Sequence, residues 1–490
     1  MRKTSHILIF DRPILSQSSL FSDSATPPAC QLTGQGWGSD YAALLLASLG
    51  LSVTRIAGQE EPHPAHTWAA CGGMALTGGA KAAPQMIPWP LASGVDGVAR
   101  AIRSLLGASG VSLTGTLPDA RTLGERAALA GLTRQGRITA GGAGRLLETR
   151  DGALAISLPR EEDWGLMPAW LETGIELLPG EPGWQRLAAL LRDRLTGPMT
   201  DRAHLMGLAV AQAESLPDTT PDWCCVTRVA RPPMRLSPRH SPLVVDLSSL
   251  WAGPLCSHLL QIAGARVIKL ESLQRPDGAR SGPAAFFDLL NHGKASVALD
   301  FSSSRGRAQL RALLAQADIV IEASRPRALR QLGLHAEEII AEHPQLTWLS
   351  ISGYGRNQPQ ADWIAYGDDA GVAAGLSGTL RELTGEWLFC GDAIADPLTG
   401  WHAALAALAG HYGGGGSLIS LSLTDVVRHC AAFRQTTGHE ALRERWQTWQ
   451  AMMPSASPVV TMPTARIAAG PARPSGADTV SILSELGIPC

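Results

Sequence analysis

The sequence predicts an α/β fold: an open parallel sheet with helices on both faces, and a smaller α+β segment beside it. The first observation behind this prediction is the alternation of short apolar runs with helical stretches between residues 243 and 351. Such alternation is typical of a parallel sheet, because each helix carries the chain back to the edge where the next strand begins. The second observation is size, since 490 residues, 45% of them apolar, can bury the cores of two or three domains.

Each element of this sheet has a local reason. Leu243–Leu247 is a short apolar run and therefore a buried strand. Gly253 and Pro254 begin a helix, because a proline in the first turn forfeits no hydrogen bond, and Gly264 ends it. Further strands are expected at 267–270, 297–299, 319–322 and 346–351, and further helices at 306–316 and 336–342.

Bulk charge predicts no nucleic-acid or membrane partner. The chain has 41 basic and 43 acidic residues and a formal net charge of −2. No uninterrupted apolar run approaches the roughly 18 residues of a membrane helix. The basic start is followed by only four apolar residues, Ile7–Phe10, too few for the core of a secretory signal, so we expect them to form a first strand.

The cysteines predict neither disulfides nor a metal site. All eight are scattered, with no CxxC motif and no Cys/His spacing that suits zinc. We interpret them as reduced thiols of a cytoplasmic protein; Cys390 could line a site, although a buried apolar role is favoured. Because no glycine-rich phosphate loop of the dinucleotide or ATP type is present, NAD and ATP are not suggested.

Part of the first half of the chain is similar in sequence to part of the second half. Residues 39–56 align with 253–270, and the identical pairs are Leu45/Leu259, Leu46/Leu260, Gly50/Gly264 and Val53/Val267. Further on, Gly97 falls on Gly400, which places Ser93 opposite Asp396. We interpret this as an internal duplication whose first copy lacks the carboxylate. The alternative is that any helix–glycine–strand unit would give such a match.

Changes of composition divide the chain into four parts. We predict a degenerate α/β half at 1–150, a small α+β domain with a linker at 151–236, the main α/β domain at 237–430 and a tail at 431–490. The linker prediction rests on the four prolines of Arg231–Pro242.

Six phrases of the second half are informative together. They read VVDLSSLWAGP (244–254), GARVIKLE (264–271), NHGKASVALDF (291–301), EASRPRALRQLGL (322–334), SISGYG (350–355) and DAIADPLTG (392–400). In this order they resemble the family III CoA-transferases, which include formyl-CoA and carnitine CoA-transferases and the α-methylacyl-CoA racemases. DGALAISLPREEDWGLMPAWL (151–171) resembles the opening of that family's small domain. The resemblance implies a Rossmann-like sheet with a smaller α+β domain.

Asp396 is the catalytic residue that this resemblance implies. An aspartate in a D-x-x-T-G setting is the nucleophile of the similar transferases, and a carboxylate can attack a thioester carbonyl to form an anhydride. Amides at the start of the following helix could stabilise the oxyanions. The alternative is that Asp396 is only a helix cap. Asp392 is a second candidate nucleophile, and Asp369 could support the reaction.

Asp368 occupies the place of the histidine in the similar racemases. Two-sided proton transfer needs two suitable bases, and no histidine lies between His343 and His402, which argues against a racemase. For CoA, a substrate here, the resemblance implies contacts from backbone and basic groups. These are Ala252, Gly253, Lys269, Arg280, Lys294 and Arg325.

The resulting prediction is an acyl-CoA:carboxylate CoA-transferase that needs no metal and no NAD. Its partners would be an acyl-CoA and a carboxylic acid. Family III enzymes are interlocked dimers, so we expect a homodimer or, given the duplication, an intrachain pseudo-dimer. An α-methylacyl-CoA racemase and a CoA-binding protein without activity are the alternatives.

Overall fold

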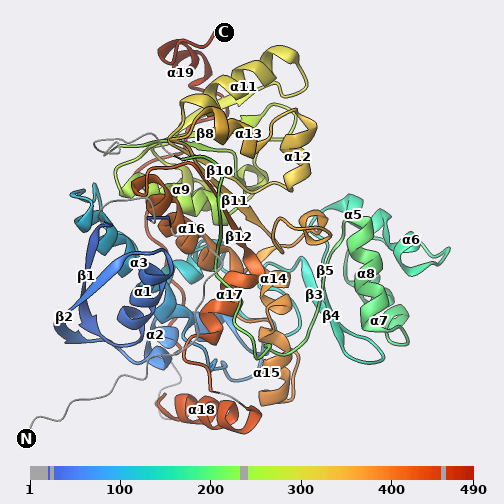
Figure 1. The fold of residues 1–490 in the computed structure, drawn as a ribbon. Helices are drawn as coiled ribbons and strands as arrows, with labels where there is room; N and C mark the ends of the chain where they lie inside the picture. The colour runs from blue at the N-terminus through green and yellow to red at the C-terminus, as the bar shows by residue number, and fades with distance from the viewer. Residues whose placement is uncertain (1–19, 22–26, 232–240, 437, 454–459, 490) are drawn as a thin grey trace, which may run out of the picture.

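The computed structural model describes residues 20–21, 27–231, 241–436, 438–453 and 460–489 (Figure 1). The strand expected at Ile7–Phe10, and the part of the predicted linker at 232–240, lie outside the described residues. Within them, no helix combines the length and the apolar character needed to cross a membrane.

The centre of the molecule is a seven-stranded sheet in the order β6-β12-β11-β10-β7-β8-β9. All neighbours are parallel except β6, which runs antiparallel to β12 at the edge. The strands are β6 (Cys225–Arg228), β7 (Leu243–Asp246), β8 (Arg266–Ser272), β9 (Ala295–Leu299), β10 (Ile319–Glu322), β11 (Thr347–Ser352) and β12 (Ser417–Ser422). The predicted open parallel sheet is confirmed.

The sheet changes direction at β7, because the chain continues to β8 and β9 on one side and to β10, β11 and β12 on the other. In open parallel sheets a ligand crevice forms at the carboxyl ends of the strands where the order reverses. The loop that leaves β7 there leads into α9. This topology therefore marks the region around residues 247–254 before any side chain is considered.

Helices cover both faces, as expected. Alternate residues of a strand point to opposite faces, so Val244 belongs to one apolar core and Val245 to the other. The first face is covered by α9 (Ala252–Ile262) and α16 (Ala395–Tyr412), and the second by α11 (Ser304–Gln316), α13 (Ala336–Glu342) and α19 (Thr479–Glu485). The helices predicted at 306–316 and 336–342 are confirmed.

A three-stranded antiparallel sheet lies to one side of the large sheet (Figure 1). Its strands are β3 (Gly144–Glu148), β4 (Ala153–Ser157) and β5 (Ala209–Gln212), and its helices are α5 (Glu161–Gly165), α6 (Met167–Leu171), α7 (Glu181–Leu191) and α8 (Thr196–Met206). Their core includes Trp164, Trp170 and Trp184. This is the smaller α+β part of the predicted fold. Its sheet begins with β3, before residue 151, and the predicted domain limits stay a prediction.

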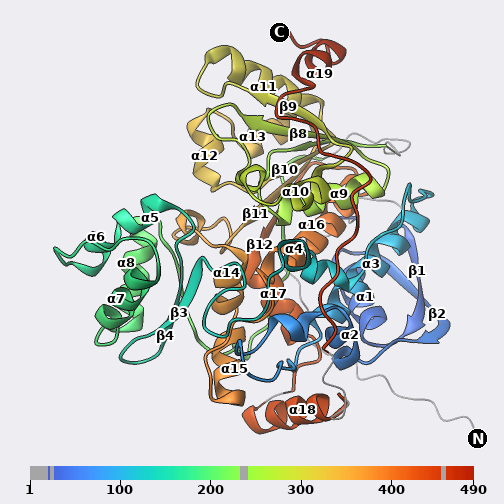
Figure 2. The ribbon, with the colours of Figure 1, turned by 180° about the vertical axis from the view of Figure 1, so that it is seen from behind.

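The opposite side carries β1 (Ala29–Gln35), α1 (Trp37–Ser48), β2 (Ser52–Glu60) and α3 (Leu91–Ala108). We call these four elements the N-terminal unit, and β7, α9, β8 and α16 the C-terminal unit. Helices α3 and α16 pack against each other, so the two units share one apolar core. Their closeness is visible in both views (Figures 1 and 2).

The remaining helices connect these parts. They are α2 (Pro64–Ala70), α4 (Glu125–Ala130), α10 (Ala284–Asn291), α12 (Pro326–Gln331), α14 (Gly367–Ala373), α15 (Leu376–Thr384), α17 (Leu423–Ala432) and α18 (His439–Ala451), with short 3₁₀ turns at Gly73–Leu76, Ala120–Gly124, Gly278–Ser281 and Gln360–Asp362. Figure 2 shows the chain before α19 running along the back of the molecule past α9 toward the N-terminal unit. There Arg466 binds Glu125, the first residue of α4.

Candidate active site

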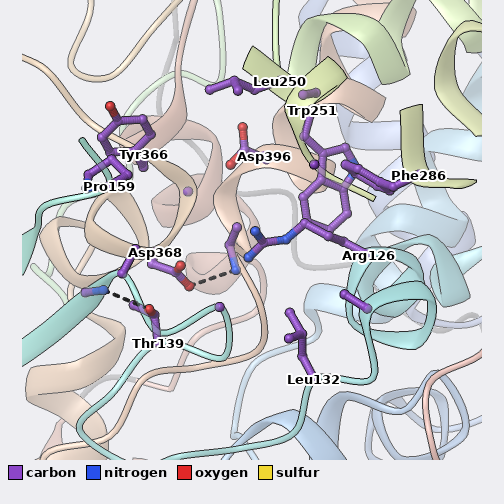
Figure 3. A pocket seen from close by; sticks show the side chains of 18 of the residues that line it. Arg126, Leu132, Thr139, Pro159, Leu250, Trp251, Phe286, Tyr366, Asp368 and Asp396 are labelled. Atoms are coloured by element: carbon purple, nitrogen blue, oxygen red, sulfur yellow. Dashed lines mark hydrogen bonds between the residues drawn. The ribbon is translucent and has the colours of Figure 1, made fainter. Parts of the chain in front are cut away.

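A cavity of about 400 Å³ lies where the loop after β7 meets the starts of α14 and α16. Its lining comes from four stretches of the chain: α4 and the loop after it, the end of β4 and the residues that follow, the loops around α9 and α10, and the residues around Asp368 and Asp396. Figure 3 shows Arg126, Trp251, Asp368 and Asp396 around this one space. The cavity is therefore at the crevice that the strand order predicts.

Asp396 is the second residue of α16 and is only partly buried, so its carboxylate can be reached from the cavity. The backbone amides of Ala252, at the start of α9, and Gly367, at the start of α14, donate to this carboxylate. Burial raises the pKa of Asp396 to about 6, and the charge of Arg126 and these two amides oppose the rise. Asp396 is thus ionised at neutral pH yet poorly solvated, which suits a carboxylate nucleophile.

Two glycines let the backbone come close enough to hold Asp396. A Cβ on Gly367 would lie 2.2 Å from Asp396 Oδ2, and a Cβ on Gly400 would lie 2.7 Å from the carbonyl oxygen of Ala252. Neither distance allows a side chain. The close approach of α9 and α14 to α16 therefore depends on glycine at both positions.

Asp368 faces the same cavity from the first turn of α14. It accepts a hydrogen bond of 2.8 Å from the amide of Ala393, whose φ of 44° lies in the left-handed region. A non-glycine residue held there costs about 1 kcal/mol or more, and such outliers gather at functional sites. Burial and the neighbouring Asp392 raise the pKa of Asp368.

Asp392 is fully buried behind the cavity wall and is paired with Arg126. The Arg126 guanidinium binds both carboxylate oxygens; its Nε donates to Oδ2 at 3.0 Å, and its Nη2 donates to Oδ1. The charges of Asp392, Asp368 and Asp396 raise the pKa of Arg126 further above its usual range. Asp392, a candidate nucleophile by sequence, thus has both oxygens occupied in this structure.

Asp369 points away from the cavity. It accepts hydrogen bonds from the Ser157 hydroxyl (2.8 Å) and from the amide of Tyr366 (3.1 Å), and so caps α14 and ties it to β4. Burial raises the pKa of Asp369 to about 7. The two neighbouring residues therefore differ in position: Asp368 lines the cavity, whereas Asp369 is buried between α14 and β4. A direct role for Asp369 stays a prediction.

The two lysines expected to contact CoA are buried and engaged within the fold. Lys269 Nζ lies 2.9 Å from Asp277 Oδ2 and donates to the Ser248 carbonyl (2.8 Å). Lys294 donates to Ser257 Oγ (2.6 Å) and lies beside Asp246. Burial lowers the pKa of Lys294 to about 8, which Asp246 partly offsets. These contacts brace the loop after β7, and a direct contact with CoA stays a prediction for both.

The two arginines expected to contact CoA lie nearer to solvent than the lysines, whereas Ala252 and Gly253 are buried. Arg280 pairs with Glu271 and covers the Phe287 ring. Arg325 lines a second cavity, of about 390 Å³, beside Arg160 and Arg327. Gly253 is needed for packing, because a Cβ there would lie 2.1 Å from Ser248. Ala252 is the one residue of this expected set whose backbone amide donates a hydrogen bond to Asp396, the candidate nucleophile.

Sequence reasoning missed Arg126 and Trp251 as part of the site. Arg126 lies in the half whose likeness to the family is loose, and nothing in its local sequence distinguishes it from the other basic residues. Trp251 lies inside the phrase at 244–254, where the glycine and proline are the obvious signals. The described residues contain no group of three His, Cys, Asp or Glu side chains that could hold a metal ion.

Comparison with known proteins gives one family. Residues 242–465 match the model of CoA-transferase family III. The succinate–glutarate CoA-transferase of Agrobacterium fabrum is 31% identical over 40% of this chain and 53% of its own length. A formyl-CoA:oxalate CoA-transferase of Rhodopseudomonas palustris is 29% identical over 41% of this chain and 51% of its own. This chain thus spans about half the length of the curated relatives it matches.

Among solved structures, a CAIB/BAIF family protein from Brucella suis aligns over 46% of this chain and 60% of its own, with 29% identity and a TM-score of 0.35. The sequence match covers every strand of the large sheet except β6, and it includes α9, α14 and α16, the three helices whose starts surround Asp396. The family match and the curated relatives agree that residues 242–465 of this chain are similar to CoA-transferase family III.

Proposed function

We propose that this chain transfers CoA from an acyl-CoA to a carboxylic acid, with Asp396 as the nucleophile. The observation that carries the proposal is the placement of Asp396. Its carboxylate opens on a cavity, is held by two backbone amides and has a pKa of about 6. A helix cap alone would not need a cavity in front of it, and α16 begins without a side-chain cap.

The chemistry balances without a cofactor. Asp396 attacks the thioester carbonyl and expels CoA thiolate, which leaves a mixed anhydride on the aspartate. The thiolate attacks the aspartyl carbonyl of that anhydride, forms an aspartyl-CoA thioester and releases the donor acid as a carboxylate. The acceptor carboxylate attacks this thioester, expels CoA thiolate and forms a second mixed anhydride with Asp396. The thiolate then attacks the acceptor's carbonyl, which gives the new acyl-CoA and releases the Asp396 carboxylate. Every step exchanges one anion for another, so no net proton is needed.

The electrostatics of the site suit these steps. The amides of Ala252 and Gly367 orient Asp396 and favour its ionised form. The same helix starts present positive ends to the oxyanions that form at the aspartyl carbonyl. A largely apolar wall, with Trp251 and Phe286, reduces the water that could hydrolyse the anhydride or thioester.

Pro159, which lines the cavity, is followed directly in sequence by a member of a cluster of basic residues suited to the phosphates of CoA. The next residue, Arg160, lines the second cavity with Arg325 and Arg327. Burial and the like charges of Arg327, Arg160 and Arg275 lower the pKa of Arg325, so positive charge gathers there. Guanidinium groups bind phosphate well, and this cluster supports a phosphate contact by Arg325.

A racemase remains the second candidate because Asp368 and Asp396 line one cavity. Two acid–base groups on opposite sides of an α-carbon could exchange its proton. This reaction would incorporate deuterium from heavy water into a recovered acyl-CoA without any acceptor. CoA transfer would not.

The test is the intact mass of the protein after mixing with acyl-CoAs, for the wild type and Asp396→Asn. The exposed Asp201→Asn on α8 is the control. An adduct of CoA mass on the wild type and the control, absent from Asp396→Asn and removed by hydroxylamine, supports the aspartyl mechanism. Deuterium uptake without an adduct favours the racemase. Acyl-CoA binding with neither result indicates an inactive binding protein.

A further inference from the structure

The N-terminal and C-terminal units have the same construction. In the first, β1 and β2 pair with Ala29 opposite Ser52 and Cys30 opposite Val53. In the second, β7 and β8 pair with Leu243 opposite Arg266 and Val244 opposite Val267, which is the same register shifted by 214 residues (243 − 29, and 266 − 52). A chance helix–glycine–strand match would not require identical strand register.

The helix ends repeat as well. Gly50, with φ 88°, lies two residues after the end of α1, and Gly264, with φ 96°, lies two residues after the end of α9. At the end of α1, the amide of Leu51 donates to the carbonyl of Leu46; at the end of α9, Ala265 donates to Leu260 at the same shift of 214 residues. Both helices therefore end in the same glycine-dependent turn.

Helices α3 and α16 extend the correspondence. A Cβ on Gly97 of α3 would lie 2.7 Å from the carbonyl oxygen of Gly38, and one on Gly400 of α16 would lie 2.7 Å from that of Ala252. Gly38 and Ala252 are themselves equivalent positions in α1 and α9. The long helix of each unit thus crosses its shorter helix at the same point, by the same close contact.

In the N-terminal unit, the position equivalent to the active site is occupied by a side chain of the same unit, Glu61. Ser93 stands where α16 has Asp396, and the Glu61 carboxylate accepts hydrogen bonds from the amides of Gly38 (2.8 Å) and Ser39 (3.1 Å) at the start of α1. Arg100 lies 3.1 Å from Glu61 and holds it there. In the C-terminal unit the corresponding amide, that of Ala252, meets the reactive carboxylate instead.

The N-terminal half nevertheless reaches the active cavity through Arg126. Among the described residues that line this cavity, Arg126 is the single cation, and it faces Asp368 and Asp396 and binds Asp392. Its short helix, α4, is held in place by Arg466, which binds both oxygens of the buried Glu125 (2.6 and 3.0 Å). Arg466 also contacts His258 of α9 at 2.9 Å. Arg126 is therefore anchored to the C-terminal unit.

We propose that the two units are diverged copies of one ancestral unit, that only the C-terminal copy keeps an active site, and that the N-terminal half completes this site in cis through Arg126. Arg126 is a positioning residue, since it acts through Asp392 and through its charge near Asp396. Three carboxylates meet there around one cation. Without the cation, Asp392 would be a buried unpaired charge and Asp396 would lose its nearest positive neighbour. The catalytic role of Asp396 rests on the proposed function, whereas the duplication does not.

The first experiment separates action in cis from action between chains. Asp396→Asn and Arg126→Met chains are co-expressed with different tags, co-purified and assayed. If Arg126 acts in cis, the mixture has no more activity than the two variants added together. If two chains shared sites, the co-purified mixed dimers would have one wild-type site of two and about one half of wild-type activity, which would overturn the proposal.

The second experiment tests the positioning role through pH. We expect Arg126→Met to move the acid limb of kcat/KM to higher pH, and Arg126→Lys to restore its position in part. Arg121→Met removes an exposed arginine that is paired with Asp119 and does not line the active cavity, and it is the matched control. A loss of activity with an unmoved acid limb would reduce Arg126 to a packing residue and overturn its proposed role.

A third measurement does not need turnover. Thermal unfolding of the wild type, Arg126→Met, Asp392→Asn and the double variant forms a double-mutant cycle. We expect Arg126→Met to lower the Tm and Asp392→Asn to restore much of the loss, because the buried charge is then removed. Additive effects would contradict a direct pairing, even if the protein proved to have no transferase activity.

A different observation, the polarity of the same cavity, points to the class of acyl group. The large apolar side chains that line it are Leu132, Leu250, Trp251, Pro283 and Phe286. Trp251 and Phe286 pack edge to face with their centroids 5.2 Å apart. Arg126 is bound to Asp392, so a second carboxylate on the acyl chain would meet Asp368 and Asp396 with no unpaired cation among the lining residues.

We infer that the site takes apolar or aromatic monocarboxylic acyl groups rather than dicarboxylic ones, an inference that rests on the proposed CoA transfer. A buried unpaired carboxylate costs several kcal/mol, whereas an apolar chain gains from burial. The curated relatives named above carry succinate, glutarate and oxalate in their names, so this chain would differ from them in its substrate.

The test compares butyryl-CoA, benzoyl-CoA and succinyl-CoA with the wild type, and their binding to Asp396→Asn by calorimetry. We expect kcat/KM and affinity to favour the first two by at least about tenfold, which corresponds to 1.4 kcal/mol. Equal or better use of succinyl-CoA would overturn the inference. Because binding is measured on Asp396→Asn, the acyl preference can be read even if no thioester turns over. Phe286→Ala should weaken benzoyl-CoA binding more than succinyl-CoA binding.

Discussion

Asp396 Oδ2 lies 2.2 Å from the point where a Cβ on Gly367 would stand. The Asp396 carboxylate can therefore occupy this position only because residue 367 has no side chain. The amide of Gly367 also donates to the same carboxylate. A glycine at the start of α14 thereby sets both the position and the ionisation of a side chain that begins α16. This relationship leads to the first prediction.

Gly367→Ala should displace Asp396 and lower kcat by about 100-fold or more, because a misplacement of about 1 Å can cost that much. The measurement is steady-state turnover of the best acyl-CoA found in the adduct screen. Gly107→Ala is the control, since nothing lies within 4 Å of a Cβ built there on α3. A Gly367→Ala enzyme with normal kcat would contradict the described geometry.

Activity should fall on the acid side with a midpoint near pH 6. The pKa of Asp396 is raised to about 6, so the nucleophile is protonated below that pH and unable to attack. The measurement is the pH profile of kcat/KM between pH 4.5 and 8.5. A midpoint near pH 4, the ordinary value of an aspartate, would show that the carboxylate is solvated.

Asp396→Asn should stabilise the protein at neutral pH. The folded state binds the Asp396 proton more tightly than the unfolded state, so the wild type loses stability as pH rises from about 4 to about 6 and does not regain it above. A neutral amide does not suffer this loss, and the gain should be about 1 to 3 kcal/mol at pH 8. Denaturant unfolding at pH 8 and pH 4 checks this, since the difference should nearly vanish at the lower pH.

Gly97→Ala and Gly400→Ala should destabilise the protein by similar amounts, about 1 to 3 kcal/mol each, because each Cβ would meet a backbone oxygen at 2.7 Å. Their effects on activity should differ. Gly400 lies one turn from Asp396, whereas Gly97 lies one turn from Ser93. Unfolding and turnover measured on both folded variants compare the two units directly; equal losses of kcat would contradict an inactive N-terminal site.

Arg325→Gln should raise KM for the acyl-CoA by about three- to tenfold with little change in kcat, since it removes one phosphate contact from a positive cluster. The increase should shrink at high salt. Arg311→Gln, which breaks an exposed pair with Glu342, is the control. An unchanged KM would show that Arg325 does not bind the phosphates of CoA.

Much of the large sheet could be predicted from the sequence because its signals are local. A buried strand is a short apolar run and a helix is a repeating apolar stripe, so the runs at 243–247 and 319–322 and the helix at 336–342 were found within a residue or two of their bounds. The edge strand Cys225–Arg228 was not, because its residues are half exposed and its partner, β12, lies far along the chain.

The lysines show the limit of residue type as evidence. Lys269 and Lys294 stand at strands where a basic residue could meet a phosphate, and the sequence alone suggests that role. The fold places Asp277 and Asp246 against them in the interior. A lysine that is paired with a carboxylate inside the fold cannot be distinguished by sequence from a lysine that is available to bind a ligand. The difference lies in the residues that surround the side chain in three dimensions.

The sequence by itself determined the α/β class, the order of the strands from 243 to 351, and the choice of Asp396 as the candidate nucleophile, whereas it missed helices α10 and α12. The features that the sequence determined depend on hydrophobic periodicity and on short motifs, and both are visible within short stretches of the sequence. Only the tertiary structure decided that Asp368 faces the cavity while Asp369 caps a helix, and that Arg126 meets Asp392 across 266 positions. Such choices follow from how distant segments pack, because burial and electrostatic contact depend on distance in space rather than along the chain.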